Sequence, residues 1–249
     1  MEIEDIGIIG TGDMGEKYAK LFARTGRQIY CCDLPERRTS LEEKLGEVGG
    51  IHVLDDGIAV SRRSDLTFYL VPVENVQEAV ARYGPSTKKG AIVSSGTSVM
   101  TPTAEAFQQY LPDDVNIVNW HWLFGPGIPD DDLPKQSSAI INQRSHDCAY
   151  QVARDAFESA NGPQIVELPS YQDHDKITAD TQAVTQTGFL GMMTTWENTE
   201  NFPWEDPTYA GGIDNVKILM GLRILAGKAH VYGGLAILNP YAPTQVRQY

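Results

Sequence analysis

Three glycines near the N-terminus have the spacing of a turn that binds dinucleotides. They form the pattern G-x-G-x-x-G directly after the apolar run at residues 6–9. In such a turn the first glycine allows a tight bend, the second lets a pyrophosphate approach the backbone, and the third lets the next helix pack on the sheet. We expect the whole turn to hold a pyrophosphate at a helix N-terminus, through Gly10, Thr11, Gly12, Asp13, Met14 and Gly15.

The choice between NAD and NADP depends on the end of the second predicted strand, at residues 28–33. Asp33 closes this strand, and Arg37 and Arg38 follow in a polar loop. A carboxylate here accepts a hydrogen bond from a ribose 2′-OH and favours NAD, whereas arginines pair with a 2′-phosphate and favour NADP. The arginines could equally belong to a solvated loop. The residues alone therefore leave the choice of cofactor open.

Three further strand ends carry residues that could take part in chemistry. Val71 and Pro72 follow an apolar strand and could pack beside a nicotinamide, and Ser98 follows the next one. His121 closes a third strand, where a neutral imidazole could accept a proton from a substrate hydroxyl. A buried structural histidine and a capping serine are the alternative interpretations of His121 and Ser98.

The C-terminal part of the chain offers a cation and a polar stripe. Arg223 lies in an otherwise apolar helical segment, where a guanidinium needs either a structural carboxylate or an anionic ligand. His174, Thr178 and Gln182 recur every four residues and would share one face of a helix. The usual interpretation of such a stripe is a solvated helix surface.

Strands and helices alternate up to Pro169, and only helical patterns follow. The alternation predicts an α/β fold with a doubly wound, mostly parallel Rossmann-type sheet, followed by a smaller all-helical region. We place the dinucleotide-binding domain at residues 1–168 and a helical substrate and dimerisation domain at residues 169–249. The sequence shows no clear terminal helix before Tyr249, so we expect this second domain to be incomplete. Its small size favours a homodimer.

Charge and composition exclude several classes of protein. The 33 acidic residues outnumber the 20 basic ones, for a net charge of −13, which argues against a nucleic-acid partner. No apolar run is long enough for a membrane span, and no signal peptide precedes the first strand. The three cysteines suggest neither a disulfide framework nor a metal site. We therefore expect a reduced, cytoplasmic protein without a bound metal.

Together these segments resemble prephenate dehydrogenase, most closely the fungal form. The resemblance covers nearly the whole chain and depends on IGIIGTGDMG, CCD, YGPSTKKG, HDKITADTQAVT at residues 174–185 and LRILAGKAHVYGGLAILNP at residues 222–240. It implies oxidative decarboxylation of prephenate to 4-hydroxyphenylpyruvate in tyrosine biosynthesis, with hydride transfer to the nicotinamide. It also implies NADP as the cofactor, which favours a role for Arg37 and Arg38.

The resemblance also implies roles for individual residues. The catalytic histidine of the family corresponds to His121, and the serine that holds it corresponds to Ser98. The arginine that binds a substrate carboxylate corresponds to Arg223, while His174 and Gln182 match a substrate-binding segment. Relatives often have a histidine where this chain has Gln186, and relatives are longer than this chain.

Three other functions compete with this interpretation. An arogenate dehydrogenase would perform the same chemistry on a substrate with an amino side chain, and the residues do not separate the two. A β-hydroxyacid dehydrogenase would need a catalytic lysine near Lys176, but the surrounding sequence favours the first family. A non-catalytic dinucleotide-binding remnant is the third, and the presence of Ser98, His121 and Arg223 argues against it.

Overall fold

A computed structural model describes residues 2–197, 202, 205 and 212–248 of the chain, without the side chains of residues 214 and 230. The chain forms two compact units, Met1–His174 and Asp175–Tyr249. The division falls six residues after the predicted boundary. Strands end before Pro169, but the first turn of the next helix still packs with the first unit, because His174 contacts a residue of the sheet.

The first unit is built on one sheet of eight strands in the order β3-β2-β1-β4-β5-β6-β7-β8. Strands β1 to β6 are mutually parallel, β7 pairs antiparallel with β6, and β8 is parallel to β7. Their bounds are Asp5–Ile9, Gln28–Cys32, Ile51–Val53, Leu66–Tyr69, Ile92–Ser95, Asn116–Trp122, Ser137–Arg144 and Gln164–Glu167. This confirms the predicted mostly parallel Rossmann-type sheet. The strand order reverses beside β1, which is where such sheets bind ligands.

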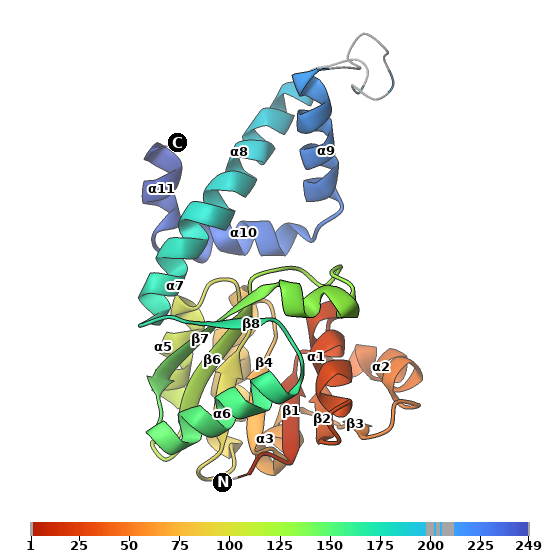
Figure 1. Ribbon diagram of the computed structural model, residues 1–249, viewed down its shortest axis with the longest axis vertical. Coiled ribbons are helices and arrows are strands. Elements are labelled where there is room, and N and C mark those ends of the chain that lie inside the picture. The colour runs from red at the N-terminus through yellow and green to blue at the C-terminus, as the bar shows by residue number, and fades with distance from the viewer. Residues whose placement is uncertain (1, 198–201, 203–204, 206–211, 249) are drawn as a thin grey trace. The chain divides into compact units, whose positions relative to one another are not determined.

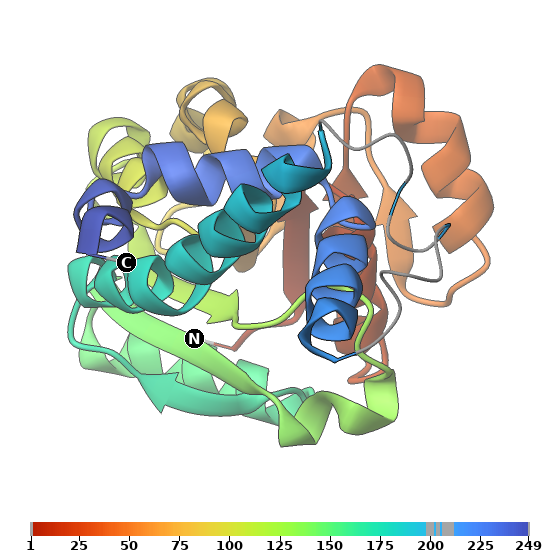
Figure 2. The same cartoon turned by 90° about the horizontal axis from the view of Figure 1, so that it is seen from above.

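Helices cover both faces of this sheet (Figures 1 and 2). Helices α1, α2 and α6 pack on one face around an aromatic cluster of Tyr18, Phe22, Trp120 and Phe157. Helices α3, α4 and α5 pack on the other face. The six helices span Asp13–Ala23, Arg38–Leu45, Gly57–Arg63, Val76–Tyr83, Thr101–Tyr110 and Asp147–Ser159. Cys31 and Cys32 are buried on opposite faces, as their adjacent positions in a strand predict.

Two local features of the first unit differ from what the sequence suggests. Ser40 and Glu43 form a capping-box pattern, yet α2 already begins at Arg38, so Ser40 lies inside the helix. Helix α3 lacks a long apolar stripe and would be overlooked on periodicity alone. Its signal is Asp56, whose side chain accepts a hydrogen bond from the backbone N–H of Ala59 at 2.9 Å and caps the helix.

In the described part of the second unit the chain is helical and contains no strand. Helix α7 (Tyr171–Thr178) continues through a π-helical turn at Ala179–Ala183 into α8 (Val184–Met193). Helices α9 (Ile213–Leu225), α10 (Ala229–Leu238) and α11 (Ala242–Gln248) follow, coloured in blue tones in Figure 1. The expectation of no terminal helix is therefore wrong. Residues 201 and 203 of a predicted interrupting loop lie outside the described residues.

Asn239 joins two segments of the second unit. Its fully buried amide donates to the carbonyl of Asp175 at 2.8 Å and to Thr178 Oγ1 at 3.2 Å, and its carbonyl accepts from the N–H of Tyr241 at 2.9 Å. We expect Asn239→Ala to lower the free energy of unfolding by about 1–3 kcal/mol, because buried polar groups lose their partners. Chemical denaturation would measure this loss. The exposed Asn142→Ala is the control, and equal stabilities of the two variants would contradict the prediction.

Candidate active site

The glycine turn has the shape that a pyrophosphate requires. Gly10 has φ +92°, and a Cβ on it would lie 2.8 Å from the backbone N of Val71. A Cβ on Gly15 would lie 2.4 Å from the carbonyl oxygen of Gly10. Gly12 differs, because a Cβ there would face open space with only a guanidinium nitrogen of Arg37 nearby, at 3.9 Å. The turn thus leaves room at the position where a phosphate approaches the backbone.

The helix that begins at this turn offers its N-terminus to the same space. Gly12 is the N-cap of α1 and provides no capping side chain for the first backbone N–H groups. An anion can therefore bind to these groups and to the positive end of the helix dipole. Val71 and Pro72 follow β4 beside Gly10, so the predicted apolar contact lies next to the turn. These residues fit a dinucleotide.

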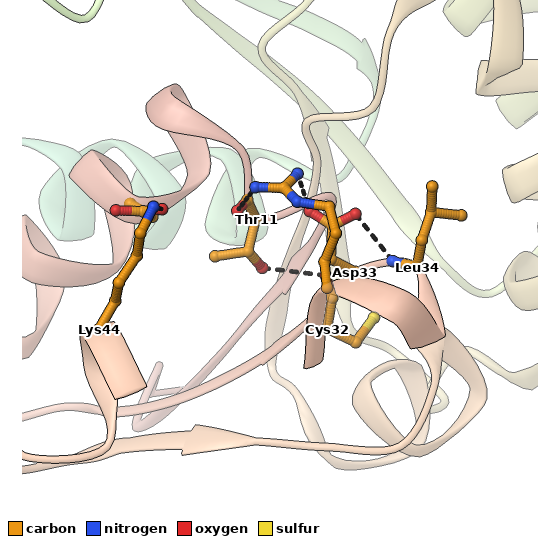
Figure 3. A network of polar contacts seen from close by, with 7 residues as sticks. Thr11, Cys32, Asp33, Leu34 and Lys44 are labelled. Atoms are coloured by element: carbon orange, nitrogen blue, oxygen red, sulfur yellow. Dashed lines mark hydrogen bonds and ion pairs between the residues drawn. The ribbon is translucent and has the colours of Figure 1, made fainter. Parts of the chain in front are cut away.

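Polar contacts hold the turn to the end of β2 (Figure 3). The carbonyl of Cys32 accepts from the N–H of Gly10 at 3.0 Å and from Thr11 Oγ1 at 2.9 Å. Asp33 is nearly buried, and its carboxylate accepts from the N–H of Leu34 at 2.8 Å. These contacts place the Asp33 carboxylate close to the turn.

The two predicted arginines lie in different surroundings. Arg37 donates to Asp33 Oδ2 at 2.7 Å and to the carbonyl of Thr11 at 3.5 Å, which places its guanidinium beside the glycine turn. Arg38 instead pairs with the exposed side chains of Glu42 and Asp55. Only Arg37 is therefore in contact with the turn and with Asp33. A cation that neutralises this carboxylate favours a ligand carrying an extra phosphate.

The structure brings Ser98 and His121 together at the carboxyl edge of the sheet. Ser98 follows β5 and His121 lies near the end of β6. The Oγ of Ser98 and the Nε2 of His121 are 3.4 Å apart, and His121 is buried. The Nδ1 of His121 lies 2.8 Å from the Nε2 of His174, which is also buried. Sequence reasoning did not identify this second contact, because 53 residues separate the two histidines.

Local hydrogen bonds fix the loop that carries Ser98. The buried hydroxyl of Thr97 contacts Ser95 Oγ at 3.0 Å and Thr103 Oγ1 at 3.1 Å, and it donates to the carbonyl of Val99 at 2.9 Å. This network sets the path of the loop on both sides of Ser98. The run of hydroxyl residues after β5 is the sequence signal that could have identified Thr97.

His174 is held by the start of α7. Ser170 Oγ accepts from the N–H of Asp173 at 3.1 Å and donates to its Oδ2 at 2.7 Å. The carbonyl of Ser170 accepts from the N–H of His174 at 3.2 Å. Such an S-x-x-D pattern fixes the first turn of a helix and hence the direction of the His174 side chain.

The predicted solvated stripe is wrong. His174 and Thr178 are buried, and Gln182 is half-buried within the π-helical turn. A π-helical turn has a different residue period from an α-helix, so a spacing of four no longer keeps side chains on one face. Gln182 is thus rotated out of line with His174.

Arg223 lies in α9 and is exposed. Among the residues that the structure describes, no acidic side chain forms an ion pair with it. Of the two partners that the sequence suggests, the described residues supply no structural carboxylate. Arg223 therefore remains available for an anion from outside these residues.

Burial, reinforced by the neighbouring His174, holds the pKa of His121 well below its usual value. His121 is therefore a neutral imidazole at neutral pH. A neutral imidazole has one nitrogen with a hydrogen and one with a lone pair, so it can act as a proton acceptor.

The depressed pKa of His121 predicts a pH dependence of stability. An unfolded histidine titrates at about pH 6.5, so below this pH the unfolded state binds a proton that the folded state does not. The free energy of unfolding should therefore fall as the pH falls below about 6.5, by up to about 1.4 kcal/mol per pH unit from this residue. Urea denaturation of the wild type and of His121→Asn between about pH 5 and 7.5 would measure it. Equal slopes for both proteins would contradict this prediction.

Comparisons with known families match both parts of the chain. Residues 5–98 match the family described as NADP oxidoreductase coenzyme F420-dependent. Residues 183–249 match a family described as a 6-phosphogluconate dehydrogenase C-terminal domain. The glycine turn and Asp33 lie within the first match, and Arg223 lies within the second.

Two curated fungal proteins are similar to the chain along its length. The probable prephenate dehydrogenase (NADP+) of Schizosaccharomyces pombe is 43% identical over 249 residues, which are 100% of this chain and 56% of that protein. The prephenate dehydrogenase (NADP+) of Saccharomyces cerevisiae is 41% identical over 247 residues, 98% of this chain and 53% of that protein. The chain is a relative of fungal prephenate dehydrogenases. It spans about half the length of these two relatives.

A solved prephenate dehydrogenase has a similar fold. The Aquifex aeolicus enzyme in complex with hydroxyphenyl propionate and NAD+ matches with a TM-score of 0.80 at 16% identity, covering 100% of this chain and 87% of that one. This likeness supports the Rossmann-type fold followed by helices. In the described residues, no three His, Cys, Asp or Glu side chains gather as a metal site would require, and no helix is long and apolar enough to span a membrane.

Proposed function

We propose that this chain carries out the oxidative decarboxylation of prephenate to 4-hydroxyphenylpyruvate with NADP as the hydride acceptor. The observation that carries the proposal is the contact of Ser98 with the buried, neutral His121, at the sheet edge where the glycine turn also lies. The similarity to the two fungal prephenate dehydrogenases supports the substrate and the cofactor. The reaction belongs to tyrosine biosynthesis.

In this proposal the protein holds the ring hydroxyl and moves its proton. The Nε2 of His121 accepts the hydrogen bond or the proton of the hydroxyl as the C–H bond of the same carbon breaks. Ser98 lies at hydrogen-bond range of that nitrogen and orients both groups. The ring then loses its carboxylate as carbon dioxide, and the electron pair of that bond makes the ring aromatic. The bound NADP supplies C4 of its nicotinamide as the hydride acceptor.

The cofactor would be held by residues that the geometry places together. The backbone of residues 10–15 and the start of α1 would bind the pyrophosphate. The guanidinium of Arg37, beside Asp33, would pair with the 2′-phosphate. Val71 and Pro72 would pack against the nicotinamide. Arg38 has other partners, and we assign it no contact with the cofactor.

The test is an assay with paired cofactors and substrates. The near-ultraviolet absorbance of reduced nicotinamide is followed with prephenate or arogenate and with NADP or NAD. We expect the highest kcat/KM with prephenate and NADP. A preference for arogenate would replace the substrate, and a preference for NAD would replace the cofactor. Cofactor binding without any turnover would overturn the proposed activity in favour of a non-catalytic protein.

We further propose that Arg223 binds a carboxylate of the substrate. We expect Arg223→Ala to raise the KM for prephenate by roughly 10- to 150-fold, because a hydrogen bond to a charged group is worth about 1.5–3 kcal/mol. The KM for NADP should be unchanged. Initial rates at varied prephenate would measure the effect, with Lys217→Ala on the same helix as the control. An unchanged KM for prephenate would assign Arg223 a structural role. Gln182 is proposed as a weaker polar contact of the substrate.

We also propose a homodimer formed through the helical unit. Helix α9 leaves large apolar side chains exposed in a spacing of three residues, with Leu219 64% and Leu225 60% exposed. Apolar side chains in such a row gain free energy when a second copy covers them. Light scattering after size exclusion should show a dimer, and Leu219→Glu should shift it toward the monomer. A monomeric wild type would overturn this proposal. A cytoplasmic location is likewise proposed, supported by the free Cys31, Cys32 and Cys148.

A further inference from the structure

The contact between His121 and His174 contains a choice that the proposed reaction does not by itself resolve. The nitrogens Nδ1 of His121 and Nε2 of His174 are 2.8 Å apart, and the two rings are inclined at 70° with their centres 5.0 Å apart. Both side chains are almost fully buried. At this distance one hydrogen lies between the two nitrogens, and one imidazole donates it while the other accepts.

The position of that hydrogen determines what His121 can do on its other side. A neutral imidazole carries a single ring hydrogen. If His121 Nδ1 carries it, His121 Nε2 has a lone pair facing Ser98. If His174 Nε2 donates instead, His121 Nδ1 is the acceptor and its Nε2 carries the hydrogen. In the second arrangement His121 cannot accept a proton from a hydroxyl.

We propose that His174 is a positioning residue whose Nε2 accepts the hydrogen bond from His121 Nδ1 and so keeps His121 Nε2 free as the proton acceptor. This inference depends on the proposed function, because it assigns His121 the role of a base. It gives His174 a role toward His121 and not a direct contact with the substrate.

The same arrangement suits the protonated state of His121. Once Nε2 has taken up a proton, both ring nitrogens of His121 are donors, and Nδ1 still needs an acceptor. If His174 already accepts in the neutral state, no hydrogen bond has to rearrange when the proton arrives. A site arranged in advance for the charge that develops lowers the barrier, since its reorganisation cost is small. The rigid first turn of α7, held by Ser170 and Asp173, keeps the acceptor in place.

Nuclear magnetic resonance of the full chain with ¹⁵N-labelled histidine tests the inference without any assay of activity. The chain has five histidines, and the signals that disappear in His121→Asn identify His121. We expect wild-type His121 to have its hydrogen on Nδ1. In His174→Leu, which has no acceptor, we expect the population with the hydrogen on Nε2 to rise. In His174→Gln, whose side-chain oxygen can lie near the position of Nε2, the wild-type form should persist.

Kinetics provide the second readout. We expect His174→Leu to lower kcat by roughly 10²-fold, within the range of acid–base contributions, with the KM for NADP unchanged. His174→Gln should recover most of kcat, whereas loss of packing alone would affect both variants. A wild-type His121 with its hydrogen on Nε2 would overturn the inference, even if His174→Leu fails to fold. An Nδ1 hydrogen in a wild type that does not oxidise prephenate would instead refute the proposed function and leave the positioning by His174 in place.

Discussion

Replacing His121 with asparagine is expected to lower kcat for prephenate oxidation by about 10²–10⁴-fold, the usual contribution of a positioned proton acceptor. The amide of asparagine can occupy the position of Nδ1 and keep the contact with His174, but it has no atom at the position of Nε2. The variant thus removes the acceptor that faces Ser98 and retains the buried hydrogen bond. The KM for NADP should not change, because the glycine turn is unaffected. Steady-state kinetics at saturating NADP would measure the effect.

His52→Asn is the matched control for this variant. His52 is an exposed histidine on β3, paired with Gln28 at 2.9 Å. The same substitution there should leave kcat at the wild-type level. If His121→Asn retains the wild-type kcat, His121 is not the proton acceptor, and its burial serves the structure alone. Circular dichroism of both variants would show that the comparison concerns folded proteins.

The second large effect is expected for cofactor choice in Arg37→Ala. The variant removes the cation next to the glycine turn and leaves the nearly buried Asp33 without its ion pair. A 2′-phosphate then loses its partner and meets an uncompensated carboxylate, while the 2′-OH of NAD gains an acceptor. We expect kcat/KM with NADP to fall by roughly 10- to 150-fold, which corresponds to about 1.5–3 kcal/mol. The value with NAD should be unchanged or higher.

Arg38→Ala separates this effect from a general loss of positive charge. Arg38 is adjacent in sequence but pairs with Glu42 and Asp55, which are exposed. Exposed ion pairs contribute about 0–1 kcal/mol, so this variant should change kcat/KM with NADP by less than about fivefold. The assignment of Arg37 would be wrong if Arg38→Ala lost activity with NADP and Arg37→Ala did not.

Much of the first unit follows from local sequence patterns. Buried parallel strands are continuous apolar runs, and the glycines that separate the first run from α1 have specific steric tasks, as at Gly10 and Gly15. These patterns are short-range, so the sheet, its doubly wound helices and the glycine turn could be predicted. Patterns without a long apolar stripe were harder to interpret. The short helix α3 depends mainly on its Asp56 cap, and the π-helical turn after α7 changes the residue period without a signal in composition.

The sequence by itself determined the Rossmann-type sheet, the phosphate-binding turn and the presence of a histidine and a serine at the carboxyl ends of neighbouring strands. Only the tertiary structure decided which of two adjacent arginines contacts Asp33, and that His174 lies against His121. The physical reason is that residue spacing specifies which face of a strand or helix a side chain occupies. It does not specify which side chain from a distant segment will lie within hydrogen-bond distance, since that depends on how the elements pack.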